Sequence, residues 1–302
     1  LFRIRVDAAQ WRWGLSFLRE CLPRRAARNT AAIASLAIYS RQQLRALRQD
    51  TGLRYESREG GILHLFEKAA EAARLPQRLE ELEALGIHGR ILGPAEAVAV
   101  EPTLAALGPR LAGALHGLDD ESGNAHLFCR GLATLAADAG VRFVFGARVS
   151  KFDVVHGVIT GVRVFDDANR SGVMRADAIV LAAGSYSAGL VRPLGLKLPI
   201  YPVKGYSITA PVVDAGLAPK ISLTDESRRV VCSRLGQHLR VAGTAELNGF
   251  DLSPNPERSV GLPPPAEAAA GTLDTLSLPP ELNGLIHLLG RWSEQLSELP
   301  AQ

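Results

Sequence analysis

One stretch of the sequence, Ala176 to Gly184, reads ADAIVLAAG and restricts the fold more than any other. Its apolar run from Ala178 to Leu181 is continuous rather than alternating, which is typical of a strand buried on both faces of a parallel sheet. The run ends in Ala-Ala-Gly, whose small side chains let the backbone approach a ligand where the strand ends. A helix beginning near Tyr186 would present free N–H groups to an anion. The alternative is a tight strand-to-helix turn that merely requires small residues, and the stretch alone does not separate the two.

Composition excludes several classes of function. The chain of 302 residues is 47% hydrophobic, enough for a substantial core in one or two domains. Its net charge is only +3 and its basic residues are scattered, so we expect no nucleic-acid partner. The seven histidines have no metal-ligand spacing, which predicts no metal site. A small-molecule ligand is the class that remains.

The cysteines and the chain start indicate the cellular setting. Three cysteines, Cys21, Cys129 and Cys232, lie far apart with no C-x-x-C pair, which favours a reducing, cytoplasmic environment over a disulfide framework. No apolar run approaches the roughly 18 to 20 residues that span a bilayer, and no signal segment opens the chain. The first residue is Leu1 and the single methionine is Met174, so we expect further residues upstream.

Periodicity predicts a mixed α and β chain. Apolar residues recur at three- and four-residue steps on both sides of Pro23, which predicts two helices there. A strand is expected at 60–66 and a helix at 67–85, broken near Pro76. The later expected elements are an extended segment at 114–118, a helix over 125–140 ending at Gly140, a strand at 141–145, a hairpin over 149–165 turning at His156-Gly157, and strands at 201–209, 228–234 and 238–247, the last two joined across 235–237.

Several motifs together carry a family resemblance. They include RNTAAIASLAIYSRQQLRAL, DDESGNAHLFCRGLATLAADAGVRF, ADAIVLAAGSYSAGL, LPIYPVKGYSIT and RLGQHLRVAGTAELNGFDL. In this order they resemble the bacterial D-amino acid dehydrogenase small subunits, within the FAD-dependent D-amino acid oxidase-like family. The resemblance covers residues 1–260 without large gaps, so it is far more specific than a lone glycine pattern.

The resemblance implies an α/β fold: a partial two-domain flavoprotein with a Rossmann-like dinucleotide-binding domain and a mixed α+β substrate domain. Residues 1–110 would form a helix-rich part and the first substrate-domain segment. Residues 111–200 would form the second part of the FAD-binding domain, and 201–260 a substrate-domain β segment. Residues 261–302, which open with a proline run and carry weak helical patterns, would be a divergent tail.

The resemblance also implies a cofactor site for FAD. The family's contact to the adenine falls on the main chain of Val149, whose side chain we expect to be an ordinary core valine. The turn against the cofactor falls on Ala182, Ala183 and Gly184. Candidates on the substrate side, near the flavin ring, are Lys204, Gly205 and Tyr206. A cation such as Lys204 could stabilise a reduced, anionic ring, and the alternative is a surface lysine at a domain crossing.

Two departures from the family matter. The family opens with G-x-G-x-x-G, which holds the FAD pyrophosphate, and no such pattern occurs in this chain. The family's G-L-R-P-x-T-P-D-G-like segment, whose arginine would bind the substrate carboxylate, is also absent after Val260. We therefore expect an incomplete chain that binds FAD weakly or not at all.

The activity that the resemblance implies is oxidative deamination of D-amino acids in bacterial amino acid catabolism. The products are 2-oxo acids and ammonia, with electrons passed to a respiratory-chain acceptor. No residue is assigned as a catalytic acid or base from its spacing. The alternatives are another amine-oxidising flavoenzyme, of glycine, sarcosine or proline type, and a noncatalytic fragment.

The localisation expected from the resemblance is cytoplasmic, with peripheral contact to the inner face of the cytoplasmic membrane. The first predicted helix carries Trp11 and Trp13 beside several arginines, a composition suited to a lipid interface. The alternative is a helix that docks its tryptophans into the protein's own core.

Overall fold

The computed structural model describes residues 7–216 and 218–253. The predicted divergent tail, 261–302, therefore lies outside the described residues. The helical elements are α1 (Ala8–Glu20), α2 (Pro23–Thr51), α3 (Ala69–Ala72), α4 (Leu75–Glu83), α5 (Pro94–Val100), η1 (Pro102–Arg110), α6 (Ala125–Asp138), η2 (Gly184–Tyr186), α7 (Ser187–Val191) and η3 (Arg192–Leu194). The strands are β1 (Ile62–Phe66), β2 (Gly89–Leu92), β3 (Gly113–Gly117), β4 (Arg148–Val155), β5 (Val158–Phe165), β6 (Ser171–Arg175), β7 (Lys204–Pro211), β8 (Ser222–Asp225), β9 (Val230–Leu235) and β10 (His238–Glu246).

A mixed seven-stranded sheet is the largest unit of the described chain. Its strand order is β2-β3-β1-β8-β9-β10-β7. The pair β1 and β8 is parallel, whereas every other neighbouring pair is antiparallel. The sheet therefore joins strands from residues 62–117 to strands from residues 204–246, and β3 contributes from beyond residue 110.

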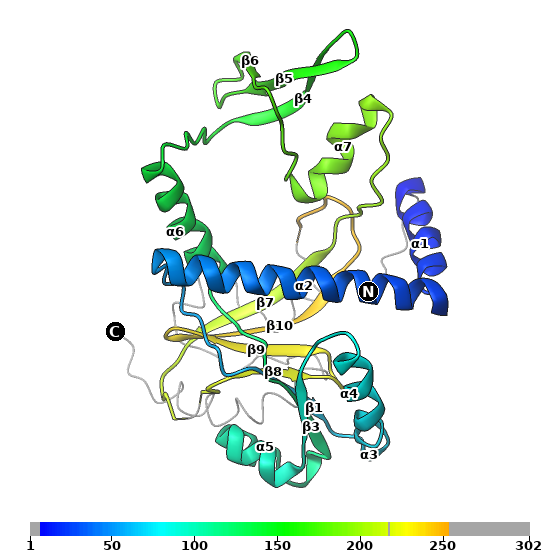
Figure 1. Cartoon of the computed structure of the whole chain (residues 1–302), viewed down its shortest axis with the longest axis vertical. Helices are drawn as coiled ribbons and strands as arrows, with labels where there is room; N and C mark the ends of the chain where they lie inside the picture. Colours follow the sequence, from blue (N-terminus) through cyan, green and yellow to red (C-terminus); the bar gives the residue numbers. More distant parts are fainter. Residues whose placement is uncertain (1–6, 217, 254–302) are drawn as a thin grey trace.

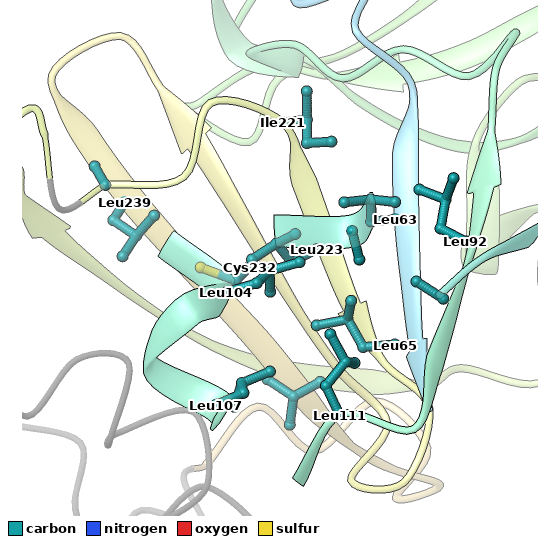
Figure 2. Close-up of a cluster of buried hydrophobic side chains, with 14 residues drawn as sticks. Leu63, Leu65, Leu92, Leu104, Leu107, Leu111, Ile221, Leu223, Cys232 and Leu239 are labelled. Carbon is teal, nitrogen blue, oxygen red and sulfur yellow. The ribbon is translucent and has the colours of Figure 1, made fainter. Parts of the chain in front are cut away.

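The main core lies between this sheet and the segment α5–η1 (Figure 2). Alternation along β1 directs Leu63 and Leu65 to this side, where they pack with Leu104 of η1 and Leu223 of β8. The opposite side of β1 directs Phe66 toward the helices α3 and α4 in a smaller cluster. Helices thus cover both faces of the β1 region, as its apolar sequence requires.

Two N-terminal helices meet at Pro23, as predicted. The helix α2 crosses the molecule between the two sheets, and α1 lies beside one of its ends (Figure 1). The other end of α2 is held to the loop after β3, where Arg48 Nη1 lies 2.8 Å from Glu121 Oε2 and donates to Tyr55 Oη. Gly52, with a left-handed φ of +66°, ends α2.

The predicted hairpin at 149–165 is confirmed. Strands β4 and β5 pair across His156 and Gly157, both with positive φ, and β6 adds a third antiparallel strand. This three-stranded sheet lies at one end of the molecule, with α5 at the other (Figure 1). Gly140, with φ +92°, follows α6 as expected from the sequence.

Two predicted strands are wrong. Residues 141–145 and 178–181 lie outside the strands, and Val180 is 90% exposed rather than buried in a parallel sheet. A continuous apolar run forms a strand of a parallel sheet where a neighbouring strand pairs with it and helices cover its faces. No strand of the described chain pairs with either segment, so apolar sequence alone does not make them β structure.

Six short elements escaped prediction because their sequences lack a clear periodicity. They are β2, α5, η1, β6, η3 and β8. The helix predicted to break near Pro76 is instead two helices, α3 and α4, with Pro76 in the first turn of the second. Within the described ranges, none of the helices is both long enough and apolar enough to cross a bilayer.

Candidate functional site

A pocket of about 1200 Å³ lies where four segments of the described chain meet. Its walls come from α1, from the η2–α7 turn, from residues 195–202 and from the end of the chain segment after β10. Two aromatic pairs line it. Tyr186 stacks on Phe250 with ring centroids 5.1 Å apart, and Trp13 lies 5.9 Å from Tyr201.

The pocket combines apolar rings with positive charge. Arg12, Arg192 and Lys197 line it, together with one carboxylate, Asp7, which accepts a hydrogen bond from Tyr201 Oη at 3.0 Å. Aromatic faces and aliphatic side chains favour a flat organic ligand, and the cations favour an anionic group on it. The pocket therefore suits a planar, negatively charged ligand.

A buried ion pair lies directly beside this pocket. Lys204 Nζ is 3.1 Å from Glu246 Oε2, and the same oxygen accepts a hydrogen bond from Tyr206 Oη at 2.8 Å. Glu246 is only 1% exposed. Burial disfavours the charged form of Lys204, but the contacts with Glu246 and Tyr206 outweigh burial, so the pKa of Lys204 is raised above its ordinary value. Lys204 therefore belongs to a buried ion pair with Glu246. It is not the surface lysine that the sequence offered as the alternative.

Lys204 also fixes the segment that carries Phe250. Its ammonium donates to the carbonyl oxygens of Asp251 at 3.3 Å and Ser253 at 2.7 Å. Hydrogen bonds from Ser253, followed by one from Asn248, lower the pKa of Asp251 to about 2. These bonds place Phe250 against Tyr186.

The turn Ala182–Gly184 leads into the same region. Gly184 has φ +53°, which L residues rarely adopt, and begins η2. A Cβ built on Gly184 would meet nothing within 4 Å, so the space beside the turn is open. Through Tyr186 and Phe250 the structure brings this turn close to the Lys204 pair, although the two motifs are 20 residues apart in sequence.

Val149 lies elsewhere, on β4, whose neighbours include α7. Its side chain is 40% exposed, so the expectation of an ordinary core valine is wrong. Val149 pairs with Val164 in the ladder, and the register shifts between Val149 and Lys151. That irregularity interrupts the regular β4–β5 ladder directly after Val149.

Sequence reasoning missed Glu246, Phe250 and Arg12. The signal for Glu246 is hidden by a β-bulge between Ala242 and Thr244, which shifts the register of β10 against β7. Because of that shift, Leu239 and Glu246 are both buried although simple alternation would put them on opposite faces.

In the described residues, no three His, Cys, Asp or Glu side chains are grouped so that they could hold a metal ion.

Comparisons with known proteins identify a matching family and several similar proteins. The family described as FAD dependent oxidoreductase matches residues 6–270. The chain is 43% identical over 262 residues to the D-amino acid dehydrogenase of Dechloromonas aromatica (strain RCB), covering 87% of this chain and 63% of that protein. It is 44% identical over 255 residues to the D-amino acid dehydrogenase of Paramagnetospirillum magneticum (strain ATCC 700264 / AMB-1), covering 84% and 59%. The chain therefore spans less than two thirds of the length of these curated relatives.

Solved structures share the fold. L-proline dehydrogenase from P. horikoshii superposes with a TM-score of 0.62 at 16% identity, over 72% of this chain and 57% of that one. Glycine oxidase from Bacillus cereus ATCC 14579 superposes with a TM-score of 0.60 at 19% identity, over 92% of this chain and 83% of that one. At such identities the likeness establishes the fold alone.

Proposed function

Because the chain belongs to the FAD-dependent oxidoreductase family, we propose that it is part of an enzyme that oxidatively deaminates D-amino acids. The observation that carries this proposal is the identity of 43–44% to proteins named D-amino acid dehydrogenase, over more than four fifths of this chain. The products would be a 2-oxo acid and ammonia. The electrons would pass to an acceptor of the respiratory chain.

The residues present fit a flat, anionic part of FAD better than they fit its pyrophosphate. The open space beside Gly184 and the aromatic, cationic pocket that follows suit a flat, anionic group. The main chain of Val149 and the turn Ala182–Gly184 would hold the cofactor. The pyrophosphate has no counterpart here, since G-x-G-x-x-G is missing from the sequence. When bound, the flavin supplies the acceptor for the hydride from the substrate Cα.

The chain's own residues would set the shape and charge of the site. Lys204 would hold Phe250 in place through the carbonyls of Asp251 and Ser253. Glu246 keeps Lys204 protonated, because their ion pair raises the pKa of the lysine. Oxidation removes a hydride from Cα and a proton from the amine, and water then adds to the imine and releases ammonia. Because Glu246 balances the charge of Lys204, the cations that would attract the substrate carboxylate are those lining the pocket, Arg12, Arg192 and Lys197.

Activity of the chain saturated with FAD tests the proposal. Reduction of an artificial electron-acceptor dye is followed with D-alanine and other D-amino acids, with each L enantiomer as the matched control. We expect dye reduction and 2-oxo acid with the D enantiomers only. Turnover of glycine, sarcosine or L-proline without turnover of D-amino acids would instead assign the chain to another amine-oxidising branch.

Flavin binding separates catalysis from a noncatalytic role. We expect weak binding, because the phosphate motif is absent and only the turn and the pocket remain. The measurement is the flavin absorbance that stays with the protein after dialysis at several FAD concentrations. A stoichiometric yellow complex would refute weak binding, and no binding at any concentration would favour the noncatalytic fragment.

A further inference from the structure

The pocket beside α7 has more room and more aromatic surface than a small amino acid can fill. Its volume of about 1200 Å³ exceeds the roughly 300–1000 Å³ that is usual for pockets holding drug-sized ligands. Tyr186 is 63% exposed and Phe250 is 56% exposed, although each packs against the other. The neighbouring lining residues Leu196, Leu198 and Ile200 are exposed as well. A concave site lined by exposed apolar side chains indicates a ligand that covers them.

Two aromatic pairs form opposite parts of the pocket wall. Tyr186 stacks on Phe250 with ring planes inclined by 28°, and Trp13 of α1 lies at 34° to Tyr201. All four rings line the pocket. Aromatic rings attract one another at centroid distances of roughly 4.5–7 Å, so a ligand that carries a ring can extend either pair. The wall therefore favours an aromatic ligand over an aliphatic ligand of the same charge.

The charge of the pocket favours a carboxylate near Arg192. This arginine begins η3 directly after α7, its side chain lines the pocket, and within the described ranges it forms no ion pair. Among the described residues that line the pocket, Asp7 is the one carboxylate, and it already accepts hydrogen bonds from Ala9 N and Tyr201 Oη. A guanidinium binds a carboxylate through two parallel hydrogen bonds, a geometry that a lysine ammonium lacks.

We propose that the pocket selects D-amino acids with a large aromatic side chain, and that Tyr186 and Phe250 determine this preference. The inference rests on the proposed function, because it names the substrates of that same site. The substrate ring would lie against the Tyr186–Phe250 pair, and the substrate carboxylate would bind Arg192. The methyl group of D-alanine would leave this pair uncovered. The flavin ring would take the open space beside Gly184.

Binding of 2-oxo acids tests the preference without turnover. Phenylpyruvate and pyruvate share the planar 2-oxo acid group and differ in the ring. Each is titrated into the full chain, without FAD and in excess FAD, and isothermal titration calorimetry gives the Kd. We expect phenylpyruvate to bind at least about tenfold more tightly than pyruvate in both conditions. Equal affinities or no binding of phenylpyruvate would overturn the proposal, and so would its displacement by FAD, because the aromatic pair would then hold the flavin.

Matched variants assign the preference to these residues. Phe250→Ala should weaken phenylpyruvate binding roughly two- to tenfold, whereas Phe250→Tyr keeps the ring and should retain it. The control Phe145→Ala removes another exposed phenylalanine, which lies outside the pocket lining, and should leave binding unchanged. Arg192→Gln should weaken the binding of both acids, whereas Arg175→Gln, at an exposed arginine of β6, should not. Equal effects of the pocket variants and their controls, with each variant folded by circular dichroism, would overturn the proposal.

Turnover separates this inference from the proposed function. In the presence of FAD and an electron-acceptor dye, kcat/KM is compared for D-phenylalanine and D-alanine, and we expect the higher value for D-phenylalanine. An equal or higher value for D-alanine would overturn the aromatic preference and leave oxidative deamination intact. Turnover of neither amino acid, with the tighter binding of phenylpyruvate retained, would contradict oxidative deamination and support the aromatic pocket.

Discussion

Gly184 and Gly189 lie in the same turn-and-helix region but differ in their backbone. Gly184 has φ +53°, whereas Gly189 lies inside the helix α7, and a Cβ on either would meet nothing within 4 Å. Space is therefore the same for both, and only conformation separates them. The sequence left two interpretations of the Ala-Ala-Gly turn, a contact with a ligand and a tight turn that requires small residues. The positive φ of Gly184 supports the second, because glycine adopts this conformation more easily than other residues.

Substitution by alanine tests this difference. Gly184→Ala should lower the free energy of unfolding by about 1–2 kcal/mol, the cost of a left-handed alanine. Gly189→Ala should raise it by roughly 0.5–1 kcal/mol, because alanine favours the helix. Urea titration followed by circular dichroism measures both. Equal effects of the two substitutions would contradict the conformational role, and a loss of FAD affinity in Gly184→Val without lower stability would favour a cofactor contact.

Lys204 and Glu246 act as a pair, so their removal should not be additive. Lys204→Met leaves the carboxylate of Glu246 buried without its cation, and the melting temperature should fall. Adding Glu246→Gln removes that charge and should recover part of the loss. Differential scanning calorimetry of the two single variants and the double variant gives the coupling. If the losses simply add, the ion pair is not what holds the segment 249–253.

The same pair predicts the direction of a pH effect. The pKa of Lys204 is raised in the folded chain, so its contribution to stability is complete below the unfolded pKa of about 10.4 and disappears as pH rises through the higher folded value. The wild-type chain should therefore lose stability above about pH 10 more steeply than Lys204→Met. A matching alkaline slope in the variant would argue against this assignment.

At the scale of elements, local signals were sufficient where the chain pairs with itself nearby. The hairpin β4–β5 was predicted from His156-Gly157, and its turn residues have the positive φ that such a turn requires. The run 178–181 has an equally strong apolar signal and forms no strand. Its state depends on neighbouring strands, which a local pattern cannot report. The bulge near Gly243 hid Glu246 for a related reason, since one extra residue reverses the direction of every later side chain.

Arg48 is the more buried of the two arginines that hold the end of α2 to Glu121. Arg48 is 16% exposed and contacts both Glu121 and Tyr55, whereas Arg45 is 37% exposed and lies 3.7 Å from Glu121. Arg48→Met should therefore destabilise the chain by about 1–3 kcal/mol, through lost charged hydrogen bonds. Arg45→Met is the matched control and should cost less than about 1 kcal/mol. Urea unfolding of both variants measures the two losses of stability. A larger loss in Arg45→Met would contradict the main role of Arg48 in attaching α2.

For the whole molecule, the sequence predicted the class of fold but not the connection between distant parts. The α/β architecture and the likeness to FAD-dependent oxidoreductases are confirmed. The parallel pairing of β1 with β8 could not be predicted, because no residue of either strand specifies a partner so far along the chain. The candidate pocket likewise joins α1 to residue 250, and only the folded chain reveals that Phe250 belongs to it.

Cys232 offers a reporter for the opening of the large sheet. It lies in the main core on β9, and burial raises the pKa of its thiol to about 12, well above the ordinary value of about 8.5. Cys21 and Cys129 are exposed. At pH 8 a thiol reagent should modify the two exposed cysteines rapidly, and Cys232 only at the rate at which the sheet opens. Mass spectrometry over time, with a urea-unfolded control, measures this, and rapid labelling of all three would contradict a closed sheet.

The parallel pair β1–β8 also has a consequence for the order of events on the ribosome. Ile62 is synthesised long before its partner Ser222. At typical bacterial or eukaryotic speeds the delay is roughly ten to thirty seconds. During that interval β1 can pair with β3, but the edge destined for β8 is open, and Leu63 and Leu65 lack part of their final cover. The nascent chain therefore presents an unpaired apolar strand edge while the residues between Ile62 and Ser222 are synthesised, and such edges are prone to aggregation.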